Sequence, residues 1–271
     1  FWAKCVELGV APATHSINMT GTHGSTSSYL YNRIGLFGTA GYAAAKGIFL
    51  SGVTQRFPGL NIAFLEGGVW YAVDLYNDLF EFWEKRNKKA MLERHDPRNA
   101  DVELMASMYE QFGNDYLSRE RFLANKDLYL RDGRKSPDEE IPEFADEWRH
   151  VKIERKEDIR DLFTQNLYFG CEADDAMNYT AFNTKANRMG AKIKAIFSSD
   201  LGHWDVVDFG DVLHETYESV EDGNMTQQDF KEFVFLNPME FATQMNPDYF
   251  KGTVVEAAVN DAVAALSAAA K

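Results

Sequence analysis

Ionisable side chains close four short apolar runs of this sequence. They are His15, Glu66, the adjacent pair Cys171 and Glu172, and Asp200. Imidazole and carboxylate groups are common zinc ligands and the usual groups of acid–base catalysis. If the four runs are parallel strands, their carboxyl ends meet at one edge of the sheet and bring these groups into one cleft. The pattern therefore favours a divalent metal site or an acid–base site.

The segment SSDLGHWD carries the strongest signal. Asp200, His203 and Asp205 follow an apolar run within six residues. We expect Asp200 to be both a metal ligand and a catalytic group, and His203 to orient Asp200 or contact substrate. The simpler interpretation is a turn whose acidic residues cap the next helix.

The other candidates also have simpler interpretations. His15 and Glu66 are candidate metal ligands, although a histidine at a strand end is commonly a hydrogen-bonded loop residue and Glu66 could cap a helix. Glu172 and His23 are candidates for substrate contacts, although His23 lies in the polar loop THGSTSS and could simply be solvated. No histidine lies near Cys171 in sequence, so a buried structural thiol is a better interpretation than a nucleophile.

The elements that position these residues read as β/α units. Helical stretches separate the apolar runs, which are typical of buried parallel strands and occupy residues 10–16, 61–68, 166–175 and 192–200. Helices are predicted at 1–10, 41–57, 70–94, 225–245 and 254–270. Four such units fit the C-terminal half of a (β/α)8 barrel with extra helices. An open doubly wound sheet is the competing architecture.

Domain organisation follows from composition. We expect a single domain over residues 1–271, interrupted by a polar helical insertion at about 94–150. The chain opens inside an amphipathic helix, FWAKCVELGV, without an initiator methionine or a signal-peptide pattern. This opening predicts that further residues precede Phe1.

Composition excludes several classes of protein. The chain is 45% hydrophobic, so it has ample material for a buried core. Its formal charge of −14 disfavours nucleic acid as a partner. Two cysteines do not make a disulfide framework, and no apolar stretch is long enough to predict a membrane span. We expect a cytoplasmic protein that acts on a small molecule.

Four longer segments carry a resemblance to a known family. They are RFPGLNIAFLEGGVWYAVDLYNDLFEFWEKRN, NLYFGCEADDAMNYTAF, IFSSDLGHWDV and FLNPMEFATQMNPDYFKGT. Together they resemble the amidohydrolase-related family of metal-dependent hydrolases and decarboxylases, in the branch that includes aminocarboxymuconate semialdehyde decarboxylase. The resemblance covers nearly the whole chain except residues 94–150.

The resemblance implies a β/α barrel with a His-x-His pair on its first strand, a histidine on the fifth, often one on the sixth, and an aspartate on the eighth. VAPATHS then matches the fifth strand and AIFSSD the eighth, so His15 and Asp200 match metal-ligand positions. Two departures stand out. Glu66 replaces the sixth-strand histidine, and Arg33 stands where similar proteins have a histidine; its planar guanidinium suits a substrate carboxylate.

These features predict a metal-dependent hydrolase that acts on a small carboxylated or cyclic substrate through water activated by a divalent metal, with zinc expected. The sequence contains no His-x-His, so we expect an incomplete site with weak metal binding and no turnover. A decarboxylase is the alternative reaction. Another alternative is a catalytically incomplete half-barrel that forms a homo-oligomer through its open strand edges. A nucleotide-binding protein is disfavoured because no phosphate-binding glycine motif follows a strand.

Overall fold

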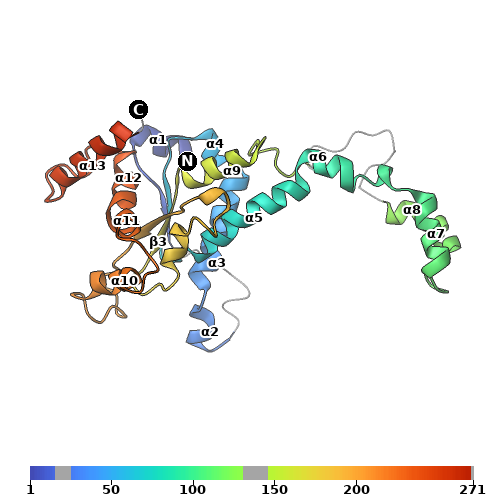
Figure 1. Ribbon diagram of the computed structural model, residues 1–271, viewed down its shortest axis with the longest axis horizontal. Helices are drawn as coiled ribbons and strands as arrows, with labels where there is room; N and C mark the ends of the chain where they lie inside the picture. The colour runs from blue at the N-terminus through green and yellow to red at the C-terminus, as the bar shows by residue number, and fades with distance from the viewer. Residues whose placement is uncertain (16–25, 131–145, 270–271) are drawn as a thin grey trace. The chain divides into compact units, whose positions relative to one another are not determined.

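The computed structural model describes residues 1–15, 26–130 and 146–269 (Figure 1). It divides into two compact units, one formed by Phe1–Phe80 with Ile153–Lys271 and the other by Glu81–Lys152. The polar insertion thus belongs to a unit that begins before residue 94. The candidate substrate residue His23 lies outside the described residues.

The first unit contains one sheet and most of the helices. Its strands are β1 (Ala13–Thr14), β2 (Ile62–Phe64), β3 (Leu167–Cys171) and β4 (Lys194–Phe197). Its helices are α1 (Trp2–Leu8), α2 (Tyr29–Arg33), α3 (Leu36–Leu50), α4 (Val53–Arg56), α5 (Trp70–Arg86, which continues into the second unit), α9 (Lys156–Thr164), the 3-10 turns η4 (Asn178–Phe182) and η5 (Arg188–Gly190), α10 (Val212–Glu221), α11 (Gln227–Lys231), the π-helical turn η6 (Glu232–Leu236), α12 (Asn237–Thr243) and α13 (Glu256–Ala269).

The four strands are parallel and follow one another in the order β1-β2-β3-β4. Each lies inside one of the apolar runs of the sequence, which confirms an α/β protein with a parallel sheet. Successive β/α units of a barrel add strands in this way, whereas a doubly wound sheet reverses its strand order at a switch point. Within the described residues the order does not reverse.

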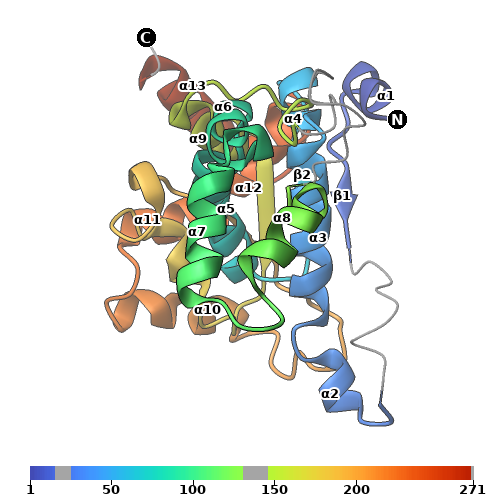
Figure 2. The same ribbon diagram turned by 90° about the vertical axis from the view of Figure 1, so that its right-hand side faces the viewer.

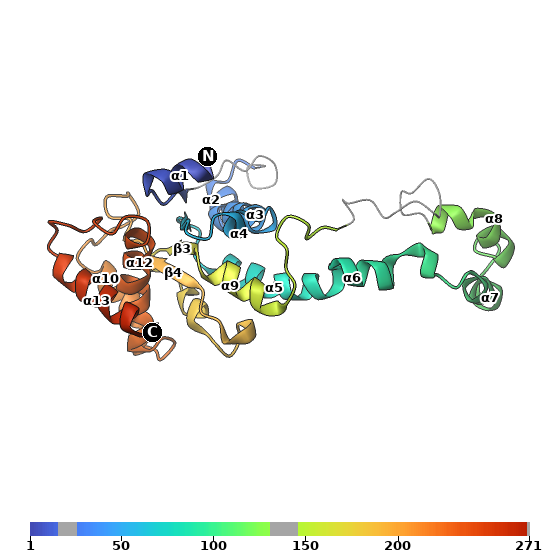
Figure 3. The same ribbon diagram turned by 90° about the horizontal axis from the view of Figure 1, so that it is seen from above.

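One face of the sheet packs against helices through aromatic side chains. Phe64 and Phe169 stack with their ring centroids 5.3 Å apart. Phe163 of α9 lies 5.9 Å from Phe169, and Tyr71 of α5 meets the same ring edge-on at 5.7 Å. Together with α3, these helices form a layer on one side of the strands (Figure 3). Burial of these rings supplies much of the hydrophobic stabilisation.

A helix also covers the opposite face. Ala63, Tyr168 and Ile196 form a buried cluster on it, and Leu65 and Phe241 of α12 pack against this cluster. The Tyr168 and Phe241 rings meet edge-on at 5.1 Å. This apolar cluster is therefore covered by α12 of the same chain.

Local backbone signals explain where the helices end. Gly52 adopts a left-handed φ of 71°, so the helix predicted at 41–57 is divided into α3 and α4. Asn87 accepts a hydrogen bond from the Ala90 amide and caps the next helix, so α5 ends at Arg86 and does not run to residue 94. No described helix has the length and apolar character needed to cross a bilayer.

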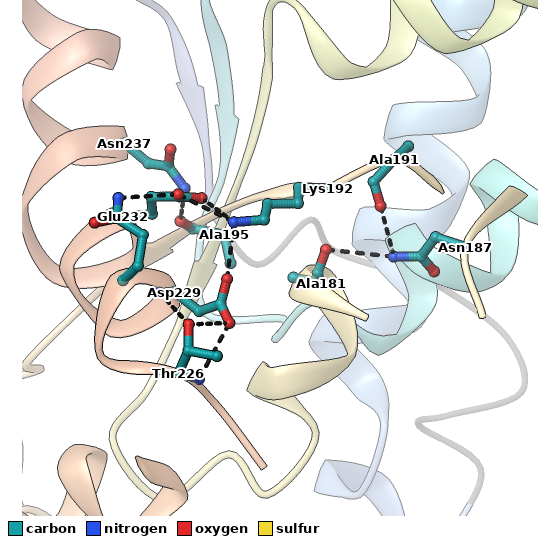
Figure 4. A network of polar contacts seen from close by, with 10 residues as sticks. Ala181, Asn187, Ala191, Lys192, Ala195, Thr226, Asp229, Glu232 and Asn237 are labelled. Atoms are coloured by element: carbon teal, nitrogen blue, oxygen red, sulfur yellow. Dashed lines mark hydrogen bonds and ion pairs between the residues drawn. The ribbon is translucent and has the colours of Figure 1, made fainter. Parts of the chain in front are cut away.

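Paired polar groups surround the amino end of β4 (Figure 4). Lys192 Nζ lies 2.8 Å from Asp229 Oδ1 and 2.9 Å from Glu232 Oε2. Asp229 also accepts hydrogen bonds from Thr226 in a capping box at the start of α11. The Asn237 side chain donates to the Ala195 carbonyl at 2.8 Å. These bonds tie α11, η6 and α12 to the edge strand.

A second polar network lies at the amino ends of β2 and β3. The buried Asn61 side chain donates to the Phe241 carbonyl and to Gln244 Oε1, both at 3.0 Å. Its Oδ1 accepts a 3.0 Å hydrogen bond from Asn166 Nδ2. The network satisfies buried polar groups and joins two strands to α12.

The second unit is helical. It contains the end of α5, then α6 (Lys88–Ala90), the π-helical turn η1 (Met91–His95), the 3-10 turn η2 (Pro97–Asn99), α7 (Val102–Phe112) and α8 (Arg119–Tyr129). Helices α7 and α8 lie side by side (Figure 2), with the Tyr109 and Phe122 rings stacked at 4.8 Å between them. Asp101 and Ser118 cap the two amino ends.

Candidate metal centre

Three predicted site residues converge at the carboxyl end of the sheet. The ligand atoms of Glu66, Asp200 and His203 all lie within 4.8 Å of one another. Glu66 follows β2, whereas Asp200 and His203 follow β4. His15, directly after β1, joins this group through Glu66, because its Nε2 lies 2.7 Å from Glu66 Oε2. The structure thus places residues from three strand ends in one cluster.

Two of these residues have an unusual backbone. Glu66 has a φ of 63° and Asp200 a φ of 47°, in the left-handed region that non-glycine residues rarely adopt. Such a conformation costs of order 1–3 kcal/mol per residue, and it concentrates at functional sites. The backbone therefore changes direction at Glu66 and at Asp200, shortly after β2 and β4 end. A shared ligand would account for retaining glutamate and aspartate at two positions where glycine fits better.

An imidazole and a guanidinium lie beside Glu66. His15 approaches one carboxylate oxygen, and Arg33 Nη2 of α2 lies 3.7 Å from the other, Oε1. The Arg33 guanidinium also lies 4.0 Å from the centre of the Phe37 ring, in a cation–π contact. Because the Glu66 side chain is only about 10% exposed, these contacts orient it within the cluster. Arg33, expected to bind a substrate carboxylate, is instead directed at a carboxylate of the protein.

His203 lies between two aspartates. Its Nδ1 is hydrogen-bonded to Asp205 and is 3.4 Å from Asp200 Oδ2. The hydrogen bond to Asp205 is the main cause of a raised His203 pKa, and the same bond lowers the Asp205 pKa. A carboxylate that holds a histidine ring in this way fixes its orientation and raises its basicity as a ligand.

A pocket of about 390 Å³ adjoins the cluster. Of the described residues that line it, none is lysine, arginine or histidine and eight are acidic: Glu172, Asp174, Asp200, Asp205, Asp208, Asp211, Glu215 and Glu218. Asp200 belongs to both the pocket and the cluster, and Asp205 of the pocket is hydrogen-bonded to His203 of the cluster. The volume is within the range of small-molecule sites. Its electrostatic potential is negative, which attracts cations and repels anions.

The pKa of Glu172 reflects the negative charge around it. Burial raises its pKa to about 7, and the charges of Glu66, Asp174, Asp175 and Asp200 add to the effect. A carboxyl group with this pKa exchanges a proton near neutral pH, which general acid–base catalysis requires.

Cys171 is fully buried, as expected for a structural thiol. Burial raises its pKa well above the usual range, and the charges of Asp175 and Glu172 raise it further. A thiol in this environment is a poor nucleophile.

Part of the site was not predicted from the sequence. Asp205 lies in the turn identified there, but its hydrogen bond to His203 was not predicted. Asp211, Glu215 and Glu218 line the pocket from α10 or its amino end, and this helix was not predicted. Their spacing of three or four residues is that of one helix face, and this periodicity was the available signal.

The cluster fits a divalent cation. Zinc accepts imidazole nitrogen and carboxylate oxygen at about 2.1 Å, which places tetrahedral ligand atoms about 3.4 Å apart. Atoms within 4.8 Å of one another reach that spacing by small side-chain rotations. The buried Glu66 carboxylate and the left-handed Asp200 provide the negative charge that such an ion needs.

Comparison with known proteins gives no match: no family model matches the chain, no curated protein matches it, and no solved structure matches it.

Proposed function

We propose that this chain carries part of the zinc centre of a metal-dependent hydrolase, formed by Glu66, Asp200 and His203 with His15 beside Glu66, and that it binds zinc weakly without a His-x-His pair. The observation that supports the proposal is the convergence of these ligand atoms, from two strand ends, within 4.8 Å. The sequence resemblance to the amidohydrolase-related family and the consecutive parallel strands agree with it. Under this proposal the catalytic groups lie at the carboxyl ends of parallel strands, where β/α proteins place them.

Each residue has a separate task in the proposed reaction. A bound zinc ion supplies a Lewis acid and a water with a pKa near 7. Asp200 Oδ2 would accept a proton from the attacking water, and Asp205, hydrogen-bonded to His203 Nδ1, would orient the His203 ring as a ligand. His15 and Arg33 hold the Glu66 carboxylate, so that Glu66 enters the site in one orientation.

The charges of the pocket indicate which substrates it can bind. A carboxylated substrate, one of the two classes expected from the sequence, would meet eight carboxylates there. Arg33, the expected partner of a substrate carboxylate, is directed at Glu66. The site therefore supports an uncharged cyclic substrate, or one with a cationic group, over an anionic one.

Zinc titration of the metal-stripped chain, followed by calorimetry, tests the proposal. We expect one zinc per chain, with affinity at least about tenfold lower in Asp200→Asn, because this change removes a charged ligand. Asp222→Asn, the same substitution at the carboxyl end of α10, is the matched control and should bind zinc normally. A panel of uncharged and cationic amides and lactones then tests for zinc-dependent hydrolysis. Absence of zinc binding, or an equal loss in the control, contradicts the proposal.

A further inference from the structure

The second unit exposes a stripe of large apolar side chains. Leu104, Met108 and Phe112 are spaced four residues apart along α7, so they lie along one side of it, and Tyr116 and Leu117 continue the surface beyond its end. These five residues are the apolar stripe. Each is between 43% and 80% exposed. Soluble proteins rarely expose a contiguous apolar surface of this kind without a partner.

The stripe borders a preformed groove at the tip of the helical hairpin. The groove has a volume of about 190 Å³, and Met108, Phe112 and Leu117 line it together with Tyr109. The turn that shapes it is fixed by hydrogen bonds from the Tyr116 and Leu117 amides to Asn114 Oδ1. A surface ordered before binding loses little conformational entropy when a partner docks.

Side chains from a different part of α7 hold the hairpin together. Ala106 and Phe122 are buried between the helices, and Tyr109 stacks on Phe122. The stripe is therefore not needed for packing α7 against α8. Its exposure requires another explanation.

The charged residues of α7 do not oppose self-association at this surface. Glu103 and Glu110, the charged residues of α7, both lie within 4.0 Å of Arg119 of α8, at 2.8 and 3.8 Å. Between the apolar residues of the stripe stand the uncharged Ser107 and Gln111. Two copies of a chain with a formal charge of −14 can therefore meet here without bringing unpaired carboxylates of α7 together.

The area also suits a pair of identical chains. At about 200 Å² for a large apolar residue, the exposed fractions of the stripe correspond to roughly 600 Å² per copy. A standard interface buries about 800 Å² per partner, and the polar rim supplies the difference. The stripe alone thus approaches the size that a specific dimer needs.

We propose that the apolar stripe is a homodimer interface, in which α7 of one copy packs antiparallel on α7 of a second copy. A two-fold axis beside Met108, the middle residue of the repeat, would bring the two Met108 side chains together. It would also place Leu104 of each copy over the groove beside Phe112 of the other. This interface is independent of the proposed metal centre and of pairing through strand edges.

Cysteine cross-linking of the full chain tests this geometry. Met108→Cys should form a disulfide-linked dimer under mild oxidation, because a residue at a two-fold axis meets its own copy. Leu128→Cys, at an exposed leucine of α8 outside the stripe, is the matched control and should remain a monomer on a non-reducing gel. The native Cys5 and Cys171 are buried, so they contribute little background.

Light scattering on the same chain gives an independent readout. We expect a dimer for the native protein and a dissociation constant at least about 30-fold higher for Phe112→Glu, with Leu128→Glu unchanged. Circular dichroism checks that the variants keep their helices. A monomeric native chain, cross-linking equal to that of the control, or a dimer insensitive to Phe112→Glu overturns the proposal.

Discussion

The two ends of the parallel sheet are built on opposite principles. At the amino end, buried polar groups find partners: Asn61 bonds to Asn166 and to α12, and Lys194 Nζ lies 2.7 Å from Glu240 Oε2. At the carboxyl end, Glu66 and Asp200 adopt left-handed backbone conformations beside a pocket lined by carboxylates. The first end stabilises the fold, whereas the second carries strain and uncompensated charge.

Backbone strain and neighbouring acidic side chains are thus found at the carboxyl end of the sheet. Parallel β/α proteins place stability at the amino ends of the strands and chemistry at the carboxyl ends. Selection for stability alone would place glycine at strained positions and would pair the acidic groups. Three substitutions test the contrast.

Replacing Asn61 should cause the largest loss of stability. Asn61→Leu removes the partner of the buried Asn166 amide and leaves the Phe241 carbonyl without its side-chain donor. We expect the free energy of unfolding to fall by about 3 kcal/mol, measured by urea denaturation. Asn125→Leu, at an exposed position of α8, is the control and should change stability by less than about 0.5 kcal/mol. Equal stabilities would show that the amino-end network is dispensable and would remove the contrast.

Replacing Glu66 by glycine should stabilise the fold and weaken metal binding. Glycine adopts a φ of 63° without strain, so we expect a gain of about 1 kcal/mol in thermal or urea unfolding. Zinc affinity should fall, because a proposed ligand is lost. A fall in stability would mean that the contacts of Glu66 with His15 and Arg33 outweigh its backbone strain.

Two controls separate strain from charge in this experiment. Glu66→Gln removes the charge but keeps the strained backbone, so the gain should be absent or small. Met189→Gly relieves a left-handed φ of 58° away from the cluster, and it should stabilise the chain without changing zinc affinity.

The third substitution tests a pH dependence. The pKa of Glu172 is about 7 in the folded chain, above its ordinary value of 4.5, so folding favours its protonated form. Its contribution to stability is therefore complete below about pH 4.5 and is lost as the pH rises through about 7. Glu172→Gln should gain stability relative to the native chain at about pH 8 but not at about pH 4. Urea denaturation of both proteins at the two pH values measures this gain. A constant difference would contradict it.

The strands were predictable because buried parallel strands are apolar and are bounded by turns. Their lengths were overestimated, because β2 ends at Phe64 and β4 at Phe197, before the left-handed turns at Glu66 and Asp200. Neither turn has glycine at its strained position, so the residue types did not predict the left-handed conformation. The packing of α12 on the sheet was also unpredictable. It depends on the contact of Phe241 with Tyr168, which is far away in sequence.

The candidate site was predictable where a residue ends a strand. Glu66 and Asp200 were identified in this way, since topology alone brings the carboxyl ends of parallel strands together. Arg33 was assigned by resemblance to a substrate role, but its nearest acidic group, Glu66, belongs to the protein. Side-chain orientation of this kind depends on local packing, here against Phe37, and spacing does not encode it.

Inserting a helical unit between β2 and β3 has a kinetic consequence. Ile62 pairs with Leu167, so the chain must close a loop of about a hundred residues before the centre of the sheet can form. Arg86 Nε donates a 2.6 Å hydrogen bond to Glu147 Oε2, which joins the ends of the insert. When this tie forms first, the remaining loop shortens to fewer than half as many residues, and closure becomes easier by roughly 1 kcal/mol. The tie itself joins residues 61 positions apart, so it divides the entropic cost of pairing the central strands between two steps.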